Sequence, residues 1–537
     1  MDCLWGRGLM SKYDIIIRGG VLVDGTGAPP FRRDIGIADG IIVKISDLSG
    51  ESAEEIIEAR DFFVAPGFID IHNHSDSSIF MLPTADNYVT QGVTTIVVGN
   101  CGYSPAPLTE ENKEFIEYGE REFIKEFGSI PWRSFSEYLK NLELLEKSLN
   151  VVTLVGHGTL RSAVLGAGEA RPTARQLEEM KNLLIEAMNA GAFGMSSGLI
   201  YVPGIFSDTI ELIELSRVVS RYGGVYATHI RNEGVGLIDA VIEATQVALA
   251  SGVSLELSHV KVAGPPAWGS VSKVLDLIEE YARRGYDFSA DAYPYAASST
   301  SLEALLPAWV REGGYEKMVE KLKKPELLNE LKSFLMRYGI PEEMHSDWDK
   351  IRVSYSENHP EVLGKNIEEI SRIWGVEPVD AIVRLLVEDE GLTNVVMHTM
   401  NEDDVVKAVS HPLVAIGSDG SVMRFGEGVP HPRNYGTFPR VIAKYVREMK
   451  VLSLPEAIRK MTSLPARKLG LYDRGVLRPG FKADIVVFNY YTIRDRATYE
   501  NPHTYSTGVE YLLVNGELVV KEGKHTGVKS GKLLRKS

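Results

Sequence analysis

Short apolar runs alternate with helical stretches along this chain, and that alternation constrains its fold more than any other feature. Eight such runs lead into a polar or glycine-rich turn, at residues 68–71, 93–98, 151–155, 191–195, 225–228, 253–258, 286–290 and 412–417. Parallel strands need a crossover between them, usually a helix, so the alternation predicts parallel βα units. Eight units predict an α/β fold with a TIM-like (β/α)8 barrel. A ninth run, 394–398, makes the count ambiguous.

The two ends of the chain have β character of a different kind. Residues 13–64 alternate β-rich runs with hairpin-type turns, and β-rich runs return at 483–488 and 511–516. We therefore expect both ends, 11–65 and 471–530, to form one small β-sandwich domain.

The residues between those ends, 66–470, are expected to form the barrel domain. Within it, residues 301–350 are helical in period and charged, and no barrel strand is predicted among them. We interpret 301–350 as a helical insertion. Two readings stay open: a lid or wall over the barrel mouth, or a peripheral addition without a catalytic part.

Charge and cysteine content narrow the classes of partner. The 537 residues carry a net charge of -15, which argues against nucleic acid as the main partner because phosphate binding needs a basic face. The two cysteines, Cys3 and Cys101, provide no disulfide framework, so a reducing, cytoplasmic location is expected. We find no apolar run of membrane-spanning length and no signal-peptide core before Met10, which is a candidate start residue.

Six metal-capable side chains follow five of the predicted strands. His72 and His74 are two residues apart, so on a strand both imidazoles point to the same side. A lone cysteine after a strand is more often an apolar filler, and a lone histidine more often a hydrogen-bonded structural residue. The joint pattern instead predicts a metal site, and thiolate, imidazole and carboxylate together suit Zn²⁺. The six residues are His72, His74, Cys101, His229, His259 and Asp419.

Zinc chemistry needs a base that takes a proton from water and returns it to the leaving group. Asp419, after the last predicted strand, is the best candidate. The alternative is a structural turn residue, because Ser-Asp-Gly is a common turn composition.

Several motifs carry a resemblance to a known family. Residues 66–74 (PGFIDIHNH) and 478–486 (RPGFKADIV) resemble the metal-dependent amidohydrolase superfamily. Further motifs resemble the N-acyl-D-amino-acid deacylases, or D-aminoacylases: 99–102 (GNCG), 194–201 (GMSSGLIY), 228–233 (THIRNE), 258–261 (SHVK) and 431–438 (HPRNYGTF).

The resemblance implies a particular division of the metal ligands. Most superfamily members bridge two metals with a carbamylated lysine or a glutamate on the fourth strand, which here ends in Met195-Ser196. The D-aminoacylase branch supplies a cysteine from the second strand instead. A tightly held zinc is therefore expected on Cys101, His229 and His259. A second, weaker site is expected on His72, His74 and Asp419.

The substrate implied is a small N-acyl amino acid with a free α-carboxylate. Arg433 is the first candidate to bind it, because arginine binds carboxylates bidentately. Lys261 and Tyr293 match positions that contact the carboxylate in the family, and Ser298 is a further candidate. The alternative for Lys261 is a solvated lysine in a loop, and the alternative for Tyr293 is an aromatic ring that serves only in packing.

The expected activity is zinc-dependent hydrolysis of N-acyl-D-amino acids to a carboxylate and a free D-amino acid. Metal-activated water attacks, and Asp419 acts as general base and acid. The first rival is a different reaction on the same scaffold: opening of a cyclic amide, as in hydantoinases and dihydroorotases, or cleavage of a D-residue dipeptide. The second rival is a binding or scaffold protein that has lost catalysis, which the intact set of six side chains argues against.

Overall fold

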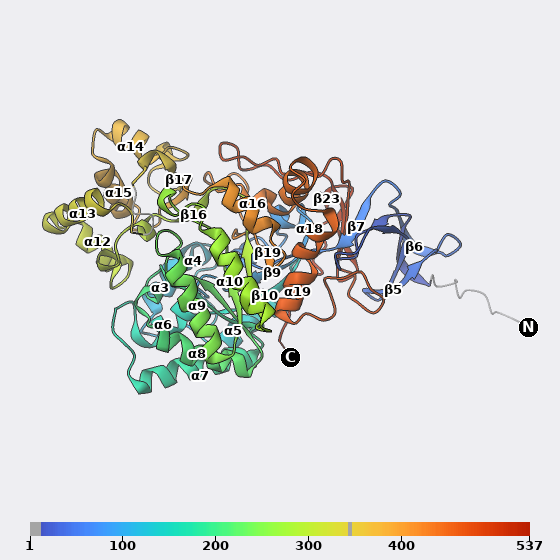
Figure 1. Ribbon diagram of the computed structural model, residues 1–537, viewed down its shortest axis with the longest axis horizontal. Helices are drawn as coiled ribbons and strands as arrows, with labels where there is room; N and C mark the ends of the chain where they lie inside the picture. The colour runs from blue at the N-terminus through green and yellow to red at the C-terminus, as the bar shows by residue number, and fades with distance from the viewer. Residues whose placement is uncertain (1–11, 342–345, 537) are drawn as a thin grey trace, which may run out of the picture.

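The computed structural model describes residues 12–341 and 346–536. Cys3, the candidate start at Met10 and the first residue of the predicted 11–65 segment lie outside the described residues. Three parts follow one another across the molecule (Figure 1): the helical insertion, the barrel, and the β-sheets that both chain ends form.

The central part is a parallel barrel. Three strands form one sheet and six strand segments form another, and each neighbouring pair is parallel. The bounds are β8 (Phe68–Asp70), β9 (Val93–Val98), β10 (Asn150–Thr153) continued by β11 (Val155–Gly156), β12 (Gly194–Gly198), β13 (Val225–His229), β14 (Ser254–Leu257), β15 (Phe288–Ala292) and β19 (Val414–Ile416). These are the eight predicted strand positions, counting β10 and β11 as one.

Backbone hydrogen bonds close the barrel between its first and last strands. Just beyond β8 and β19, the Asp419 amide donates to the His72 carbonyl at 2.8 Å, and the His74 amide donates to the Gly420 carbonyl at 2.8 Å. The side chain of Asp70 adds to this seam, because it accepts 2.7 and 2.6 Å hydrogen bonds from the amide and hydroxyl of Ser418. The predicted (β/α)8 fold is therefore confirmed.

Amphipathic helices cover the outside of the barrel. In α10 (Val271–Arg283), Val271, Val274, Leu275 and Ile278 are buried, which is the spacing of one helix face. A capping box at Thr173 begins α7 (Ala174–Ala190), as the Thr-x-x-Gln pattern favours. The other helices of the barrel part are α1 (Ser78–Met81), α2 (Asp86–Val89), α3 (Lys113–Gly119), α4 (Arg121–Phe127), α5 (Phe135–Leu144), α6 (His157–Leu165), α8 (Thr209–Arg221), α9 (Leu237–Ser251), α16 (Glu402–Ser410), α17 (Arg433–Arg440), α18 (Leu454–Met461) and α19 (Ser463–Leu469).

The insertion leaves the barrel after β15 and has a core of its own. Its strands form an antiparallel sheet in the order β16 (Ser298–Ser301), β18 (Asn394–Met397), β17 (Ile351–Tyr355). Around them pack α11 (Ala308–Arg311), α12 (Tyr315–Leu322), α13 (Pro325–Tyr338), α14 (Ile367–Trp374) and α15 (Pro378–Glu388).

The separate core of the insertion settles the count of barrel strands. Residues 394–398 contain β18 of the insertion, not a ninth barrel strand. The buried residues that share this core run from Leu302 to Met397, further along the chain than the predicted 301–350. The sequence did not reveal this extent because β17 and β18 are β-rich runs between helices, and barrel strands have the same pattern.

Both chain ends meet in a seven-stranded sheet in the order β23-β22-β21-β20-β7-β2-β3. Its central pairing joins β7 (Phe63–Pro66) to β20 (Ile485–Phe488) in antiparallel fashion. A four-stranded sheet, β5-β4-β1-β6, shares a hydrophobic core with it. The remaining bounds are β1 (Tyr13–Arg18), β2 (Val21–Leu22), β3 (Phe31–Arg32), β4 (Asp34–Ala38), β5 (Ile41–Ser46), β6 (Ala53–Glu58), β21 (Val509–Val514), β22 (Glu517–Lys521) and β23 (Lys524–His525).

The boundaries 11–65, 66–470 and 471–530 stay predictions. Among the described residues, no helix is both long and apolar enough to cross a membrane.

We predict that Asp70→Ala lowers the free energy of unfolding by about 3 kcal/mol, because it leaves buried donors at the barrel seam without their acceptor. Urea unfolding followed by circular dichroism measures the change. Asp61→Ala, at an exposed position, is the matched control and should shift stability by less than about 0.5 kcal/mol. Equal stability of the two variants would contradict the role of Asp70.

Candidate active site

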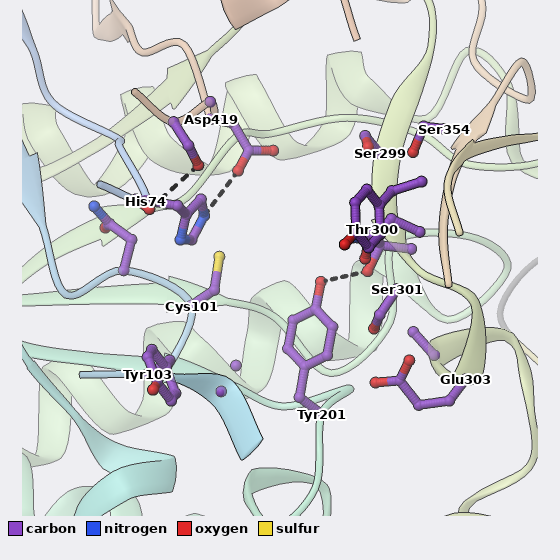
Figure 2. Close-up of a pocket in the computed structure, with 18 of the residues that line it drawn as sticks. His74, Cys101, Tyr103, Tyr201, Ser299, Thr300, Ser301, Glu303, Ser354 and Asp419 are labelled. Carbon is purple, nitrogen blue, oxygen red and sulfur yellow. Dashed lines mark hydrogen bonds and ion pairs between the residues drawn. The ribbon is translucent and has the colours of Figure 1, made fainter. Parts of the chain in front are cut away.

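A cavity of about 980 Å³ lies at the carboxyl ends of the barrel strands, where such barrels place their chemistry. Figure 2 shows barrel residues on one side of it and residues of the insertion on the other. Of the predicted site residues, eight line this cavity: His74, Cys101, His229, His259, Lys261, Ser298, Asp419 and Arg433. His72 is fully buried beneath them.

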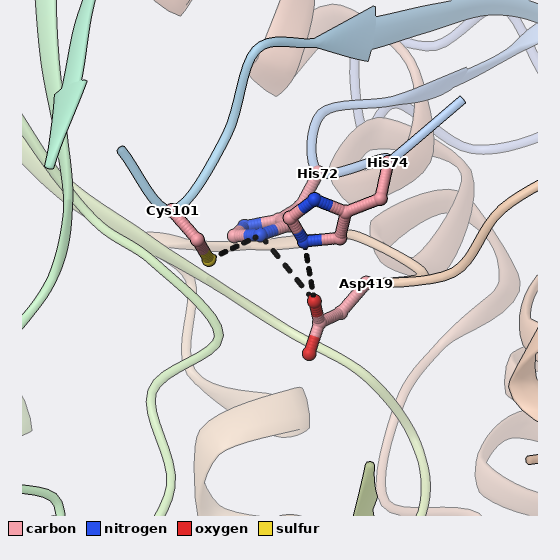
Figure 3. A group of neighbouring side chains, drawn as sticks. All are labelled: His72, His74, Cys101 and Asp419. Carbon is pink, nitrogen blue, oxygen red and sulfur yellow. Dashed lines mark hydrogen bonds and ion pairs between the residues drawn. The ribbon is translucent and has the colours of Figure 1, made fainter. Parts of the chain in front are cut away.

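Four side chains from three strand ends converge on one point (Figure 3). The Cys101 Sγ atom lies 3.4 Å from His72 Nε2. Asp419 Oδ1 lies 3.0 Å from His74 Nε2 and 3.5 Å from His72 Nε2. The potential ligand atoms of this set all lie within 4.8 Å of one another.

Cys101 also belongs to a second set, with His229 and His259. Its Sγ atom lies 3.8 Å from His229 Nδ1 and 3.3 Å from His259 Nε2. A thiolate and two imidazoles fit a zinc ion that keeps one coordination position open. The structure brings the six candidate ligands together in two groups that share Cys101, whereas the predicted second set contained only His72, His74 and Asp419; which residues bind metal stays a prediction.

The backbone holds three of these candidate ligands in the left-handed region. The φ angles are 50° at Cys101, 34° at His259 and 52° at Asp419. This conformation is unfavourable for residues with a Cβ atom and persists where the surroundings impose it. Each of the three lies in the turn just beyond the end of a barrel strand.

The electrostatics of the cluster favour a bound cation. Burial raises the pKa of the Cys101 thiol, but the imidazoles of His259 and His72 lower it further, to well below its usual value. The thiolate, which is the form that binds metal, is therefore favoured. Burial also raises the pKa of Asp419, while the Arg433 guanidinium and the His259 imidazole bring it well below its usual range.

The predicted carboxylate-binding cations lie beside the cluster, and each is already paired with an acidic side chain. Arg433 Nη1 donates to Asp419 Oδ2 at 2.7 Å. Lys261 Nζ donates to Glu233 Oε1 at 2.7 Å. Tyr293 lies behind both, with its ring centre 4.9 Å from the Arg433 guanidinium and 5.8 Å from Lys261 Nζ.

Sequence reasoning missed two acidic side chains that orient the histidines. Glu233 Oε1 lies 3.1 Å from His259 Nδ1, which is also 2.9 Å from Lys261 Nζ, and the other ring nitrogen, Nε2, faces Cys101. Asp291 lies 3.3 Å from His72 Nδ1 and accepts a 2.9 Å hydrogen bond from the His259 amide. Such outer partners fix the orientation of metal-ligating histidines. The signal for Asp291 was its place at a strand end, and the signal for Glu233 was its spacing from His229.

Tyr201 was also missed as a site residue. Its ring packs edge-on against His229 with 5.1 Å between centroids, and its hydroxyl lies 3.0 Å from Thr300 Oγ1. It joins the cluster to the first strand of the insertion. Nothing in the sequence signals this contact, because β16 is placed only by the fold.

The chain is similar to known proteins over nearly its whole length. The N-acyl-D-glutamate deacylase of Alcaligenes xylosoxydans xylosoxydans is 36% identical over 531 residues, covering 98% of both chains. The D-aminoacylase of the same organism is 34% identical, again with 98% of both chains covered. The family model named Amidohydrolase family matches residues 347–520. The chain belongs to the D-aminoacylase family of amidohydrolases.

Solved structures of this family agree. A crystal structure of the N-acyl-D-glutamate deacylase from Bordetella bronchiseptica, complexed with zinc and a phosphonate mimic of the tetrahedral intermediate, superposes with a TM-score of 0.83 at 34% identity, covering 98% of this chain and 100% of that one. A D-aminoacylase described as defining a novel subset of amidohydrolases gives 0.82 at 34% identity, covering 97% of this chain and 100% of that one. The predicted family resemblance is therefore confirmed, and zinc in a family member agrees with the donor set found here.

We predict that Cys101→Ser loses most of its zinc, because Cys101 is the ligand that both sets share. After dialysis against zinc-free buffer, the unmutated protein should retain about one zinc ion per chain, measured by plasma emission spectrometry. Cys3→Ser, which changes the other cysteine, should retain the same amount as the unmutated protein. Full zinc content in Cys101→Ser would remove Cys101 from the ligand set.

Proposed function

We propose that this protein is a zinc-dependent amidohydrolase that cleaves the amide bond of N-acyl-D-amino acids, releasing a carboxylate and a free D-amino acid. The observation that carries the proposal is the Cys101–His229–His259 set in one cavity with the Asp419–Arg433 pair. A metal site and a cation for the α-carboxylate are what an N-acyl amino acid requires. The D configuration is supported by the D-specific names of the relatives.

The role proposed for Asp419 is proton transfer. A bound zinc ion supplies polarisation of the acyl carbonyl and a lowered pKa for water. Asp419 Oδ1 faces His74 and the ligand set, so it is placed to take the proton from the attacking water. The same carboxylate then gives the proton to the departing amine. The other oxygen, Oδ2, stays hydrogen-bonded to Arg433, which fixes the carboxylate plane.

Arg433 is proposed as the main anchor for the α-carboxylate. Its Nη1 atom is used by Asp419 and its Nη2 atom makes a long, 3.3 Å bond to the Ser299 carbonyl. A guanidinium has five donors, so it can also bind an incoming carboxylate. Lys261 lines the same cavity, and we propose that Tyr293, which packs behind both cations and does not line that cavity, supports them. Ser298, at the start of β16 on the cavity wall, completes the proposed set.

We propose one tight zinc site, on Cys101, His229 and His259, and a second, weaker one on His72, His74 and Asp419. A metal on the second set would occupy the carboxylate needed as a base. One D-aminoacylase structure is described in terms of a binuclear metal centre with one-metal activation and second-metal attenuation, which is consistent with that conflict. With two cysteines in 537 residues, we also propose a reducing, cytoplasmic location.

The cyclic-amide alternative lacks a comparable observation. Barrel strand β12 ends in Ser196, Ser197 and Gly198, none of which can bridge two metals as a carbamylated lysine does. An L-hydantoinase from Arthrobacter aurescens matches with a TM-score of 0.55 at 17% identity, a likeness that shows a shared fold alone.

The proposal predicts chelator-sensitive release of free amine from N-acetyl-D-amino acids and not from their L counterparts. Purified protein, with added zinc or with a chelator, is assayed against paired D and L substrates with apolar, acidic, amide and basic side chains. Amine release is followed with a fluorogenic amine reagent. Absence of release from every D substrate by zinc-loaded protein would overturn the proposed activity.

We predict that Asp419→Asn lowers kcat by about 100- to 10,000-fold, because an amide cannot accept the proton that general base catalysis requires. Zinc content should stay the same if Cys101, His229 and His259 form the tight site. The control is Asp403→Asn, at an exposed position of α16, which should leave kcat unchanged. A kcat within tenfold of the unmutated value would show that Asp419 is not the base.

A further inference from the structure

The insertion places a carboxylate in the cavity that the proposed reaction does not use. Glu303 lies in the short 3-10 helix Leu302–Leu305, directly after β16. It lines the cavity, yet its side chain is only 7% exposed. The hydroxyls of Ser301 and Tyr315 and the Arg311 guanidinium act on its carboxylate, while Oε2 makes no hydrogen bond of ordinary length among the described residues. The carboxylate is therefore held in the cavity wall with acceptor capacity left over, which a donor on a ligand can use.

The position of β16 shows how far Glu303 lies from the place proposed for the substrate α-carboxylate. Arg433, the proposed anchor of the α-carboxylate, contacts this strand through the Ser299 carbonyl at 3.3 Å. Glu303 is four residues further along, at most about 14 Å of extended chain. In Figure 2 the Glu303 carboxylate is directed toward Tyr201, on the side of the cavity that faces the metal ligands. The wall between anchor and carboxylate carries the hydroxyls of Ser299, Thr300 and Ser301.

This geometry distinguishes the two ends of an N-acyl amino acid. The acyl carbon must lie at the Cys101, His229 and His259 set, where the chemistry occurs. The α-carbon lies next to the carboxylate anchor and therefore next to β16. The group that extends along β16 toward Glu303 is then the amino-acid side chain and not the acyl group.

The cations around the cavity do not offer an acidic side chain an equivalent partner. Arg121 and Arg424, which also line the cavity, pair with Glu390 and Glu126 at 3.0 and 2.9 Å. Arg311 is the cation that acts on Glu303, and its Nη1 atom donates to the Ile200 carbonyl at 2.7 Å. The ionised Glu303 carboxylate can only accept hydrogen bonds and would repel a second carboxylate placed beside it.

We infer that Glu303 is a specificity residue that binds a hydrogen-bond donor at the end of the substrate side chain. The preferred substrates are N-acyl-D-amino acids with a long cationic or amide side chain, such as D-lysine or D-glutamine, and acidic side chains are disfavoured. This inference rests on the proposed deacylase function, and it separates the chain from relatives named for D-glutamate and D-aspartate.

The test compares kcat/KM for N-acetyl derivatives of D-lysine, D-glutamine, D-norleucine and D-glutamate. D-Norleucine has the lysine chain without the amine, so it reports on the alkyl part alone. We expect lysine and glutamine to exceed norleucine about ten- to hundredfold, the range for a hydrogen bond to a charged group. The gain should appear as a lower KM with little change in kcat, because this contact is made in ground and transition states alike.

Glu303→Gln isolates the contribution of the carboxylate. In this variant the lysine-to-norleucine ratio should fall about tenfold or more, and kcat/KM for D-glutamate should rise. Norleucine turnover within about twofold of the unmutated protein shows that the variant is folded. Glu316→Gln, an exposed position of the same insertion, should leave every ratio unchanged.

Three results would overturn the inference while the deacylase function stands. They are equal use of lysine and norleucine, a preference for D-glutamate, and an unchanged lysine-to-norleucine ratio in Glu303→Gln. A fourth measurement compares kcat/KM for N-glycyl-D-norleucine and N-acetyl-D-norleucine. If the terminal amine of the glycyl group raises kcat/KM, and Glu303→Gln removes this increase, Glu303 contacts the acyl group and the inference is wrong. Absence of turnover with every D substrate would instead refute the proposed function, and with it this inference.

Discussion

The closure of the barrel at the β8–β19 seam is the constraint on which the site depends. Metal-capable side chains from the first and last strands, His72, His74 and Asp419, become neighbours only because this seam closes. The Asp70 carboxylate supports the seam through the Ser418 amide and hydroxyl. A buried acid in the barrel wall therefore helps to fix a carboxylate that lies 349 residues further along the chain.

The barrel and the convergence of six metal-capable side chains at its strand ends could be predicted because both follow from periodicity. Parallel strands end at one face, so a polar residue after each apolar run must approach the others. That His72, Cys101 and His229 approach one another needed no knowledge of loop structure. The division of the candidate ligands into two metal sets came from the family resemblance and stays a prediction. The start of α7 at Thr173 could also be predicted, because its capping box depends only on residues three positions apart.

Other features depend on contacts that periodicity does not encode. Whether 394–398 belongs to the barrel or to the insertion depends on its antiparallel pairing with β16 and β17, and short β-rich runs do not reveal their partners. The pairing of Lys261 with Glu233 and of Arg433 with Asp419 likewise requires the fold. Both predicted cations line the cavity, but each forms an ion pair with a carboxylate that the sequence did not identify as its partner.

The attachment of the insertion has a consequence for how enzymes of this kind diversify. Its strands pair with one another and its core is separate from that of the barrel, so substitutions within it leave the metal ligands in place. It nevertheless supplies one wall of the cavity, from Ser298 to Glu303. Selection can therefore act on substrate choice and on bond cleavage through different parts of one gene. New substrates can then evolve after duplication without rebuilding the chemistry, because the wall and the ligands are encoded in separate segments of the chain.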